Sequence, residues 1–273
     1  RVFVAGTTGE SLSLRTEERK ELAEAWARSA NGRLRVIVHV GHNCLDEAQE
    51  LAEHAQTVGA DAVSAMPPCF FRPESLEDLL GWCAAIAGAA PELPFYFYYI
   101  PSMTGGSVSV PEFIRRARER IPHFAGVKFT HEDLAEYRSA VGADETLDIL
   151  FGRDELLLSG LQAGARGAVG STYNFAAPLY QTLMEAYRQG DQTLAEQLQQ
   201  EACRMIDLCR DSGGHILAAF KAVMEWVGID CGPARPPLRN LSAQQKTHLI
   251  QTLARNLPAV RWCRSKRKPA VLP

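Results

Sequence analysis

The sequence lacks several patterns that mark common classes of protein. Its seven cysteines are scattered, odd in number and never spaced as CxxC, which suggests neither a zinc site nor a disulfide framework. No GxGxxG segment follows a strand-like run and there is no P-loop, so the usual nucleotide-binding signatures are missing. No apolar run reaches the length of a membrane span, which argues against a membrane partner. Thiols without a disulfide pattern favour a reducing, cytoplasmic setting.

Charge of one sign is also scarce. The 273 residues carry a formal net charge of −3, and most of the chain has no basic stripe, so nucleic acid is not an expected partner. The exception is a basic tail within residues 258–273, which we expect to be a disordered, solvated terminus. Hydrophobic residues make up 46% and charged residues 22%, the profile of a soluble globular protein with a sizeable core.

Short β-rich runs alternate with longer runs of helical period, and this alternation predicts parallel strands covered by helices. The runs are almost continuously apolar, as expected of strands buried on both faces. We expect seven strands, at residues 2–6, 36–41, 62–66, 95–100, 125–129, 148–152 and 167–170. Beyond residue 170 only helical patterns follow, at residues 178–189, 192–209, 216–227 and 243–257.

Two architectures fit this order: an open doubly wound sheet, or a (β/α)8 TIM barrel with a C-terminal helical appendage. The missing nucleotide signatures favour the barrel. The predicted domains are a barrel over 1–190, helices over 191–257 and the tail over 258–273. A barrel needs eight strands, and the chain opens at Arg1 directly into a strand-like run. We therefore expect the first strand–helix unit to be missing, as in a fragment or an isoform that folds poorly alone.

The stretch GVKFT, residues 126–130, places a lysine inside a strand that reads as buried. Strand alternation puts Lys128 and Thr130 on one face and Phe129 on the other. If the lysine face points into the barrel, desolvation lowers the pKa of Lys128, and the neutral amine is a nucleophile for carbonyl carbon. The alternative is a lysine that extends to solvent at the strand end. Tyr98, in the preceding strand, is a candidate proton carrier, and its presence favours a reactive Lys128 over a lysine that extends to solvent.

In a parallel barrel the active site lies where the strands end and the following loops begin. The GTTGE turn, residues 6–10, has hydroxyls and amides that could hold a small carboxylate, or it could be a capping turn that satisfies only its own backbone. Asp154 and Glu155 follow another strand and could equally be helix N-terminal residues favoured by the macrodipole. Almost every strand end carries groups able to bind or react.

Several motifs, in order and at familiar spacing, resemble those of the pyruvate-dependent class I aldolases. They are GTTGE, YYIP followed by SMTG, GVKF, GRDE and GAVGSTYN, and the likeness covers about residues 1–240. Within the dihydrodipicolinate synthase / N-acetylneuraminate lyase family, the sequence is most similar to the N-acetylneuraminate lyase branch. The resemblance implies a (β/α)8 barrel, a homotetramer, and cleavage of sialic acid to N-acetylmannosamine and pyruvate without metal or organic cofactor.

The resemblance also implies a role for each matching residue. Lys128 would form a Schiff base with pyruvate or with the keto carbon of sialic acid, and Tyr98 would carry the proton during carbon–carbon cleavage. Thr7 and Thr8 would hold the pyruvoyl carboxylate. The sugar chain and its hydroxyls would be contacted by Thr130, Gly152, Asp154, Glu155 and Ser171.

Departures from the family pattern bear on these roles. Dihydrodipicolinate synthase usually has an arginine where this chain has Met103, and methionine cannot make a bidentate carboxylate contact, which favours a sugar substrate. Cys69 and Phe70 stand where bacterial relatives have a tyrosine that reaches a neighbouring subunit, so a proton relay through that position is not expected here. Tyr99 replaces the usual asparagine or histidine. The alternatives are a pyruvate aldolase for another sugar acid and a catalytically silent barrel that acts as a scaffold.

Overall fold

The computed structural model describes residues 1–106, 108–258 and 260–263. The chain forms two compact units. The first contains Arg1–Gly152 and Ala163–Val169, and the second contains Arg153–Gln162 and the chain from Gly170 onward. This division falls earlier than the boundary at 190 drawn from the sequence, which stays a prediction.

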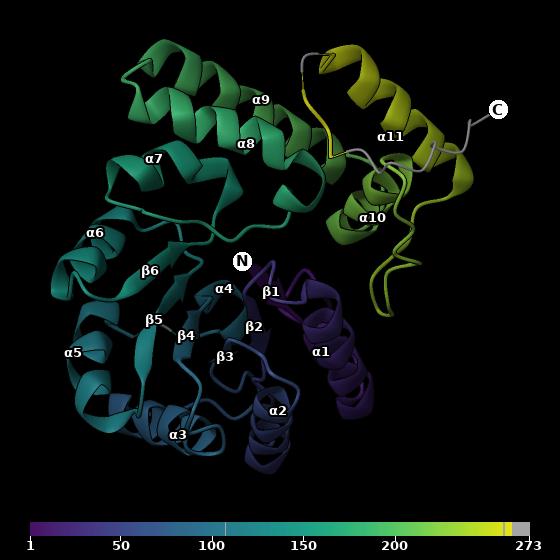
Figure 1. Ribbon diagram of the computed structural model, residues 1–273. Coiled ribbons are helices and arrows are strands. Elements are labelled where there is room, and N and C mark those ends of the chain that lie inside the picture. Colours follow the sequence, from purple (N-terminus) through teal and green to yellow (C-terminus); the bar gives the residue numbers. More distant parts are fainter. Residues whose placement is uncertain (107, 259, 264–273) are drawn as a thin grey trace. The chain divides into compact units, whose positions relative to one another are not determined.

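The first unit is built on a six-stranded parallel sheet whose strands follow one another in chain order (Figure 1). Every neighbouring pair is parallel, as the alternation of strands and helices predicts. The fold is therefore α/β, and the sheet makes half of a barrel. The strands are β1 (Val2–Val4), β2 (Val36–His39), β3 (Ala62–Ala65), β4 (Phe95–Tyr99), β5 (Phe124–Phe129) and β6 (Asp148–Phe151).

The seventh predicted strand, residues 167–170, is wrong as a strand. Ala168 forms a single parallel bridge to Phe151, and no ladder extends from it in the described part of the chain. The reason lies in its partner: β6 ends at Phe151, and the chain turns at Gly152, so one residue alone is left to pair. The residues GAVG are compatible with a strand, but they do not reveal how many residues of β6 can pair with them.

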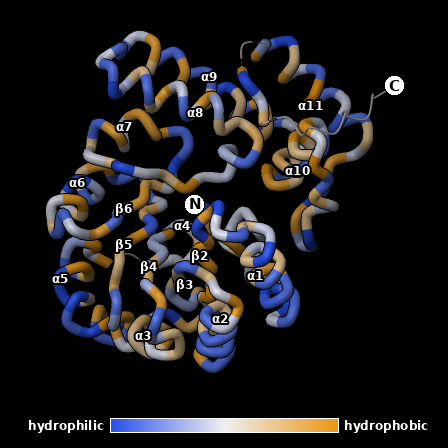
Figure 2. The backbone as a smooth tube through the Cα atoms, viewed as in Figure 1, coloured by the Kyte–Doolittle hydropathy of each residue, from blue (hydrophilic) through white to orange (hydrophobic). Residues whose placement is uncertain are grey.

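Amphipathic helices cover the outer face of this sheet (Figure 1). In α2 the buried side chains Ala48, Leu51, Ala52 and Ala55 form one stripe, and hydrophobic colour gathers on the strands and on such faces in Figure 2. The Ser75 hydroxyl caps α3 by accepting from the Asp78 amide at 3.1 Å. The helical elements are η1 (Ser11–Ser13), α1 (Thr16–Ala30), α2 (Leu45–Thr57), α3 (Leu76–Gly88), α4 (Pro101–Thr104), α5 (Val110–Arg120) and α6 (Leu134–Ala143).

The inner face of the sheet is packed in layers. Ile37, Tyr96 and Leu150, from three different strands, form one buried cluster with Phe3 against it. Alternation along β4 then places Tyr98 on the same inner face, two residues further along. A second cluster of Tyr98, Met66 and Ile100 lies there, again against Phe3. The two clusters together therefore extend the core from the middle of the sheet to the ends of the strands.

One helix of this unit sends a charged side chain into the interior. Arg19 of α1 is 1% exposed, and its guanidinium donates to the carbonyl oxygens of His39 at 2.7 Å and Gly41 at 3.0 Å. Burial lowers the pKa of Arg19 to about 10, which still leaves it charged at neutral pH. Because two carbonyls share one planar fork, Arg19 fixes the end of β2 on α1.

Arg19→Lys is expected to lower the free energy of unfolding by about 2 kcal/mol, because an ammonium cannot serve both carbonyls in the same geometry. The variant Lys20→Met at the neighbouring, partly exposed position removes only an ion pair with Glu50 and should change the free energy of unfolding by less than about 1 kcal/mol. Urea unfolding with a common slope measures both. Equal effects of the two variants would show that the buried fork adds nothing.

The second unit consists of helices. They are η2 (Asp154–Leu156), α7 (Leu157–Gln162), α8 (Tyr173–Arg188), α9 (Gln192–Arg210), α10 (Ile216–Trp226) and α11 (Ala243–Asn256). All four long helices expected from the sequence are present. The first of them, α8, begins five residues before the predicted start at Pro178, because a kink at Ala176 accommodates the proline inside the helix.

The chain after α11 folds back on this unit. Val260 is buried, the Cys263 amide donates to the Phe175 carbonyl at 2.8 Å, and the Trp262 ring lies edge-on to Trp226 with centroids 5.0 Å apart. Most of the predicted basic tail, residues 264–273, lies outside the described residues. None of the described helices combines the length and the apolar character needed to cross a membrane.

Candidate active site

Lys128 lies inside the first unit, on β5, where its register neighbours are Tyr98 of β4 and Leu150 of β6. Only 6% of the residue is exposed. Its Nζ lies 3.5 Å from the centroid of the Tyr98 ring and 4.7 Å from that of Phe3. The amine is therefore held over aromatic faces instead of extending to solvent, and the packing of β1, β4 and β5 fixes where it points.

Tyr98 carries a phenol directly beside this amine. Its hydroxyl lies 3.0 Å from the Thr7 hydroxyl, close enough for a hydrogen bond in which either group donates. Burial raises the pKa of Tyr98 to about 12, and the Thr7 hydrogen bond opposes that rise. The phenol therefore carries its proton at neutral pH.

Thr7 and Thr8 lie in the turn that follows β1. The Thr7 carbonyl accepts from the Glu10 amide at 3.0 Å, and the Gly6 carbonyl accepts from the Ser11 amide at 3.3 Å. A side chain at Gly6 would lie 2.8 Å from the Phe3 ring, so glycine lets the turn close over that ring. The turn thereby brings the Thr7 hydroxyl to the Tyr98 hydroxyl, and Thr8 is the next residue of the same turn.

Thr130 and Gly152 meet at the ends of β5 and β6. The Thr130 amide donates to the Tyr99 carbonyl at 2.8 Å, and the Gly152 amide donates to the Phe129 carbonyl at 2.7 Å. A Cβ at Gly152 would stand 2.0 Å from the Thr130 hydroxyl oxygen. That hydroxyl is buried without a hydrogen-bond partner among the described residues, although it lies close enough to Tyr98 to favour the phenolate form.

Asp154 is buried in the second unit. One carboxylate oxygen accepts from the Thr172 amide at 2.8 Å and from the Thr172 hydroxyl at 2.6 Å. Since that hydroxyl gives its proton to Asp154, the Tyr180 hydroxyl, 2.6 Å away, donates to Thr172. A Cβ at Gly170 would overlap the Asp154 carboxylate, so glycine is required there. Asp154 is held by a chain of donors that the sequence alone does not suggest.

Glu155 stands beside arginines in the same unit. Its carboxylate lies 3.4 Å from the Arg210 guanidinium and 3.9 Å from that of Arg153. The local backbone is held by Gln199 of α9, which donates to the Asp154 carbonyl at 3.1 Å and accepts from the Leu158 amide at 2.9 Å. Ser171 also lies in the second unit, where its carbonyl accepts from the Asn174 side chain at 2.9 Å.

The residue that departs from the family pattern after Tyr98 has a structural place. The Tyr99 side chain points to the opposite face of β4, where its hydroxyl donates to Glu136 of α6 at 3.4 Å. The other oxygen of Glu136 accepts from the Val110 amide at the start of α5. Tyr99 thus links β4 to two covering helices instead of facing Lys128.

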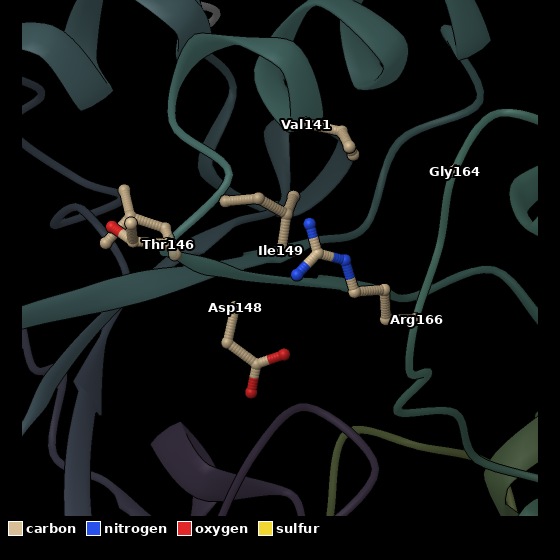
Figure 3. Close-up of a pocket in the computed structure, with 7 residues that line it drawn as sticks. Val141, Thr146, Asp148, Ile149, Gly164 and Arg166 are labelled. Carbon is tan, nitrogen blue, oxygen red and sulfur yellow. The ribbon is translucent and has the colours of Figure 1, made fainter.

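A small cavity of about 140 Å³ lies elsewhere in the first unit (Figure 3). It is lined by residues at the start of β6, including Asp148 and Ile149, whereas Lys128 pairs with Leu150 further along. Figure 3 shows the Asp148 carboxylate pointing away from the Arg166 guanidinium, so these charged groups do not converge on a ligand. No group of three His, Cys, Asp or Glu that could hold a metal is found in the described ranges.

The first unit thus places a buried lysine, a protonated phenol and a hydroxyl-bearing turn at the carboxyl ends of parallel strands. These features define a parallel α/β protein with a buried lysine at the ends of its strands. The model of the dihydrodipicolinate synthetase family matches residues 1–256, and the chain belongs to that family.

Individual members of the family to which the chain is similar are N-acetylneuraminate lyases. The chain is 42% identical over 239 residues to N-acetylneuraminate lyase A of Xenopus laevis, a match that covers 87% of this chain and 78% of the relative. Among solved structures, Proteus mirabilis N-acetylneuraminate lyase aligns with a TM-score of 0.89 at 38% identity, covering 93% of this chain and 85% of the other. A catalytic lysine mutant of Ruminococcus gnavus sialic acid aldolase aligns with a TM-score of 0.88 at 29% identity, over 95% and 86% of the two chains.

Proposed function

We propose that this protein is a Schiff-base aldolase that cleaves N-acetylneuraminate to N-acetylmannosamine and pyruvate. The observation that carries the proposal is the Lys128 amine, buried and held 3.5 Å from the centre of the Tyr98 ring in a chain whose relatives are named N-acetylneuraminate lyases. Imine formation uses an amine as the nucleophile, and the Tyr98 and Phe3 rings fix where this amine points.

The reaction begins when the Lys128 amine adds to the keto carbon of the open-chain sugar acid. Loss of water gives the protonated imine. The bond that then breaks joins the carbon next to the imine carbon to the hydroxyl-bearing carbon beyond it, and its electron pair moves towards the imine nitrogen to leave an enamine. The hydroxyl on the departing fragment loses its proton and becomes the aldehyde of N-acetylmannosamine. Protonation of the remaining enamine and hydrolysis of the imine release pyruvate, so the water lost at first is returned.

Tyr98 is the group we assign to the proton transfers. Its phenol stands beside the amine and is linked to the Thr7 hydroxyl, which offers a path for the proton between two oxygens. We assign binding of the pyruvoyl carboxylate to Thr7 and Thr8, because their turn carries hydroxyl and amide donors. No metal or organic cofactor enters these steps, since the protonated imine is itself the electron sink.

Sugar binding is assigned on the resemblance and on the chemistry of the side chains. Thr130, Gly152, Asp154, Glu155 and Ser171 are the proposed contacts. Thr130 and Gly152 approach so closely that the ends of β5 and β6 are held in one arrangement. Asp154 and Glu155 have carboxylates that can accept hydrogen bonds from sugar hydroxyls. Met103, 58% exposed, offers no charge for a second carboxylate, which favours the sugar over the substrate of dihydrodipicolinate synthase.

Three further assignments complete the proposal. The six parallel strands form part of a (β/α)8 barrel, supported by their order and by the likeness to solved N-acetylneuraminate lyases. The protein is a homotetramer, supported by the family resemblance and by the exposed Phe70 and Phe71 rings, 77% and 84% accessible. It acts in the cytoplasm, in keeping with its scattered free cysteines. Light scattering of the purified protein gives the mass of the assembly directly.

Incubation with pyruvate and borohydride tests the chemistry before any substrate is assumed. We expect the intact mass to rise by one reduced pyruvyl group and peptide mapping to place it on Lys128, because borohydride reduces an imine to a stable amine. Turnover of N-acetylneuraminate then tests the substrate. A folded protein that gains no adduct, or gains it on the exposed Lys246 instead, would overturn the proposal.

A further inference from the structure

A buried histidine at the end of β2 takes no part in the steps of the proposed reaction. His39 is 1% exposed and is the last residue of its strand. Alternation places it on the same face as Ile37, which packs in the inner cluster with Tyr96. A polar ring in this position faces the interior of the sheet, where Lys128 and Tyr98 also lie.

The hydrogen bonds of His39 define its tautomer. Nδ1 lies 3.0 Å from the Ala5 carbonyl and 3.1 Å from the Ser11 hydroxyl. A carbonyl only accepts, so Nδ1 carries the proton and Nε2 has the lone pair. Burial, and then the positive charges of Arg19 and Lys128, hold the pKa of His39 well below its usual value. The ring is therefore neutral, and it adds no charge beside the amine.

His39 contacts both sides of the Thr7–Tyr98 hydrogen bond. Its ring lies edge-on to the Tyr98 ring, with centroids 5.5 Å apart and planes at 90°. Its Nδ1–H holds the carbonyl of Ala5, two residues before Thr7. Ala5 has a φ of 54°, which lies in the left-handed region. A residue with a Cβ adopts this conformation at a cost of about 1 kcal/mol. The backbone that delivers Thr7 is thus held in an unfavourable conformation by a donor from β2.

We infer that His39 is a positioning residue which fixes the Thr7–Tyr98 contact, and with it the direction in which the Tyr98 proton moves. The ring plane of Tyr98 and the backbone before Thr7 meet at this one side chain, so a change there separates the two oxygens without touching Lys128. This inference rests on the proposed aldolase function.

A histidine that serves only to fill the core is the competing interpretation, and the two differ in what substitution does. His39→Asn places an amide N–H near the position of Nδ1, His39→Gln places it near Nε2, and His39→Leu keeps volume but removes the donor. Ser64→Ala is the matched control, because Ser64 is the register neighbour of His39 on β3 and is buried with no hydrogen-bond partner of its hydroxyl in the described chain.

The experiment measures pyruvate trapping on Lys128, thermal unfolding, and kcat and KM for N-acetylneuraminate across pH in each full-length variant. We expect the leucine and glutamine variants to trap pyruvate as fully as the unsubstituted protein, while kcat falls on the order of 10²-fold with KM little changed, since misplacing a reacting group by about 1 Å has that cost. The asparagine variant and Ser64→Ala should retain most of kcat.

Two results would overturn the inference. In one, the loss of kcat in every variant equals the loss in the fraction of protein that is folded and traps pyruvate on Lys128. In the other, asparagine is no better than glutamine, a comparison that holds even if the leucine variant does not fold. Failure of the proposed function is separate and visible first, because the unsubstituted protein would then trap no pyruvate, and a positioning role in that reaction would fall with it.

Discussion

Lys128→Ala is expected to reduce cleavage of N-acetylneuraminate on the order of 10⁴-fold or more, because the reaction loses its covalent nucleophile. The same variant should gain no pyruvyl group after borohydride treatment. The buried position of the amine over the Tyr98 and Phe3 rings means that no water or exposed lysine can take its place. Steady-state kinetics and intact mass give both results from one preparation.

Two further variants give this experiment its contrast. Lys128→Arg keeps a positive charge but cannot form an imine, so it should be as inactive as the alanine variant. Lys246→Ala removes an exposed lysine paired with Glu225 in the second unit and should keep full activity. A scaffold protein would retain its binding in all three. Residual turnover within tenfold of the unsubstituted protein in Lys128→Ala would rule out a Schiff base at this residue.

Tyr98→Phe is expected to lower kcat for cleavage by roughly 10²–10³-fold, the usual loss when a general acid–base group is removed. Phenylalanine keeps the ring beneath the Lys128 amine and the edge contact with His39, so the substitution removes the hydroxyl alone. After long incubation, pyruvate should still be trapped on Lys128. The signature is therefore a loss of cleavage with the adduct retained.

Tyr96→Phe is the matched control for that variant. Tyr96 lies two residues earlier on the same face of β4, where its hydroxyl donates to Asp148 at 3.3 Å, away from the amine. Its removal should change kcat by less than a few fold. If Tyr96→Phe and Tyr98→Phe lose the same activity, the effect belongs to the packing of the sheet and the proton role of Tyr98 is wrong.

Local patterns predicted the elements well because hydrophobic periodicity is a local property. Six of the seven expected strands are present in the expected order, and each ends one or two residues before its predicted end, except β5, which ends at Phe129 as predicted. The predicted ends ran into glycine, proline or turn residues that no longer pair. The seventh strand failed because its partner, β6, ends at Phe151, which is a property of another segment.

The candidate site was only partly accessible from the sequence. Lys128, Tyr98 and the threonine turn were selected because they lie at expected strand ends, and the structure brings Lys128, Tyr98 and Thr7 together. Thr172 and Tyr180, which hold Asp154, were missed, since neither a threonine just before a helix nor a tyrosine within it signals a buried carboxylate. The pairing of Glu155 with Arg210, 55 residues later, was equally hidden.

The sequence by itself determined the class of fold and the residues available for chemistry, because alternation, burial and strand ends are written in short segments. Only the tertiary structure decided which side chains meet. Lys128 lies 30 residues from Tyr98 and 121 from Thr7, and the amine faces the phenol because the register of β4 and β5 makes these two residues neighbours. The tautomer of His39 follows from a carbonyl 34 residues away. Such contacts depend on register and desolvation, which arise only when distant segments pack.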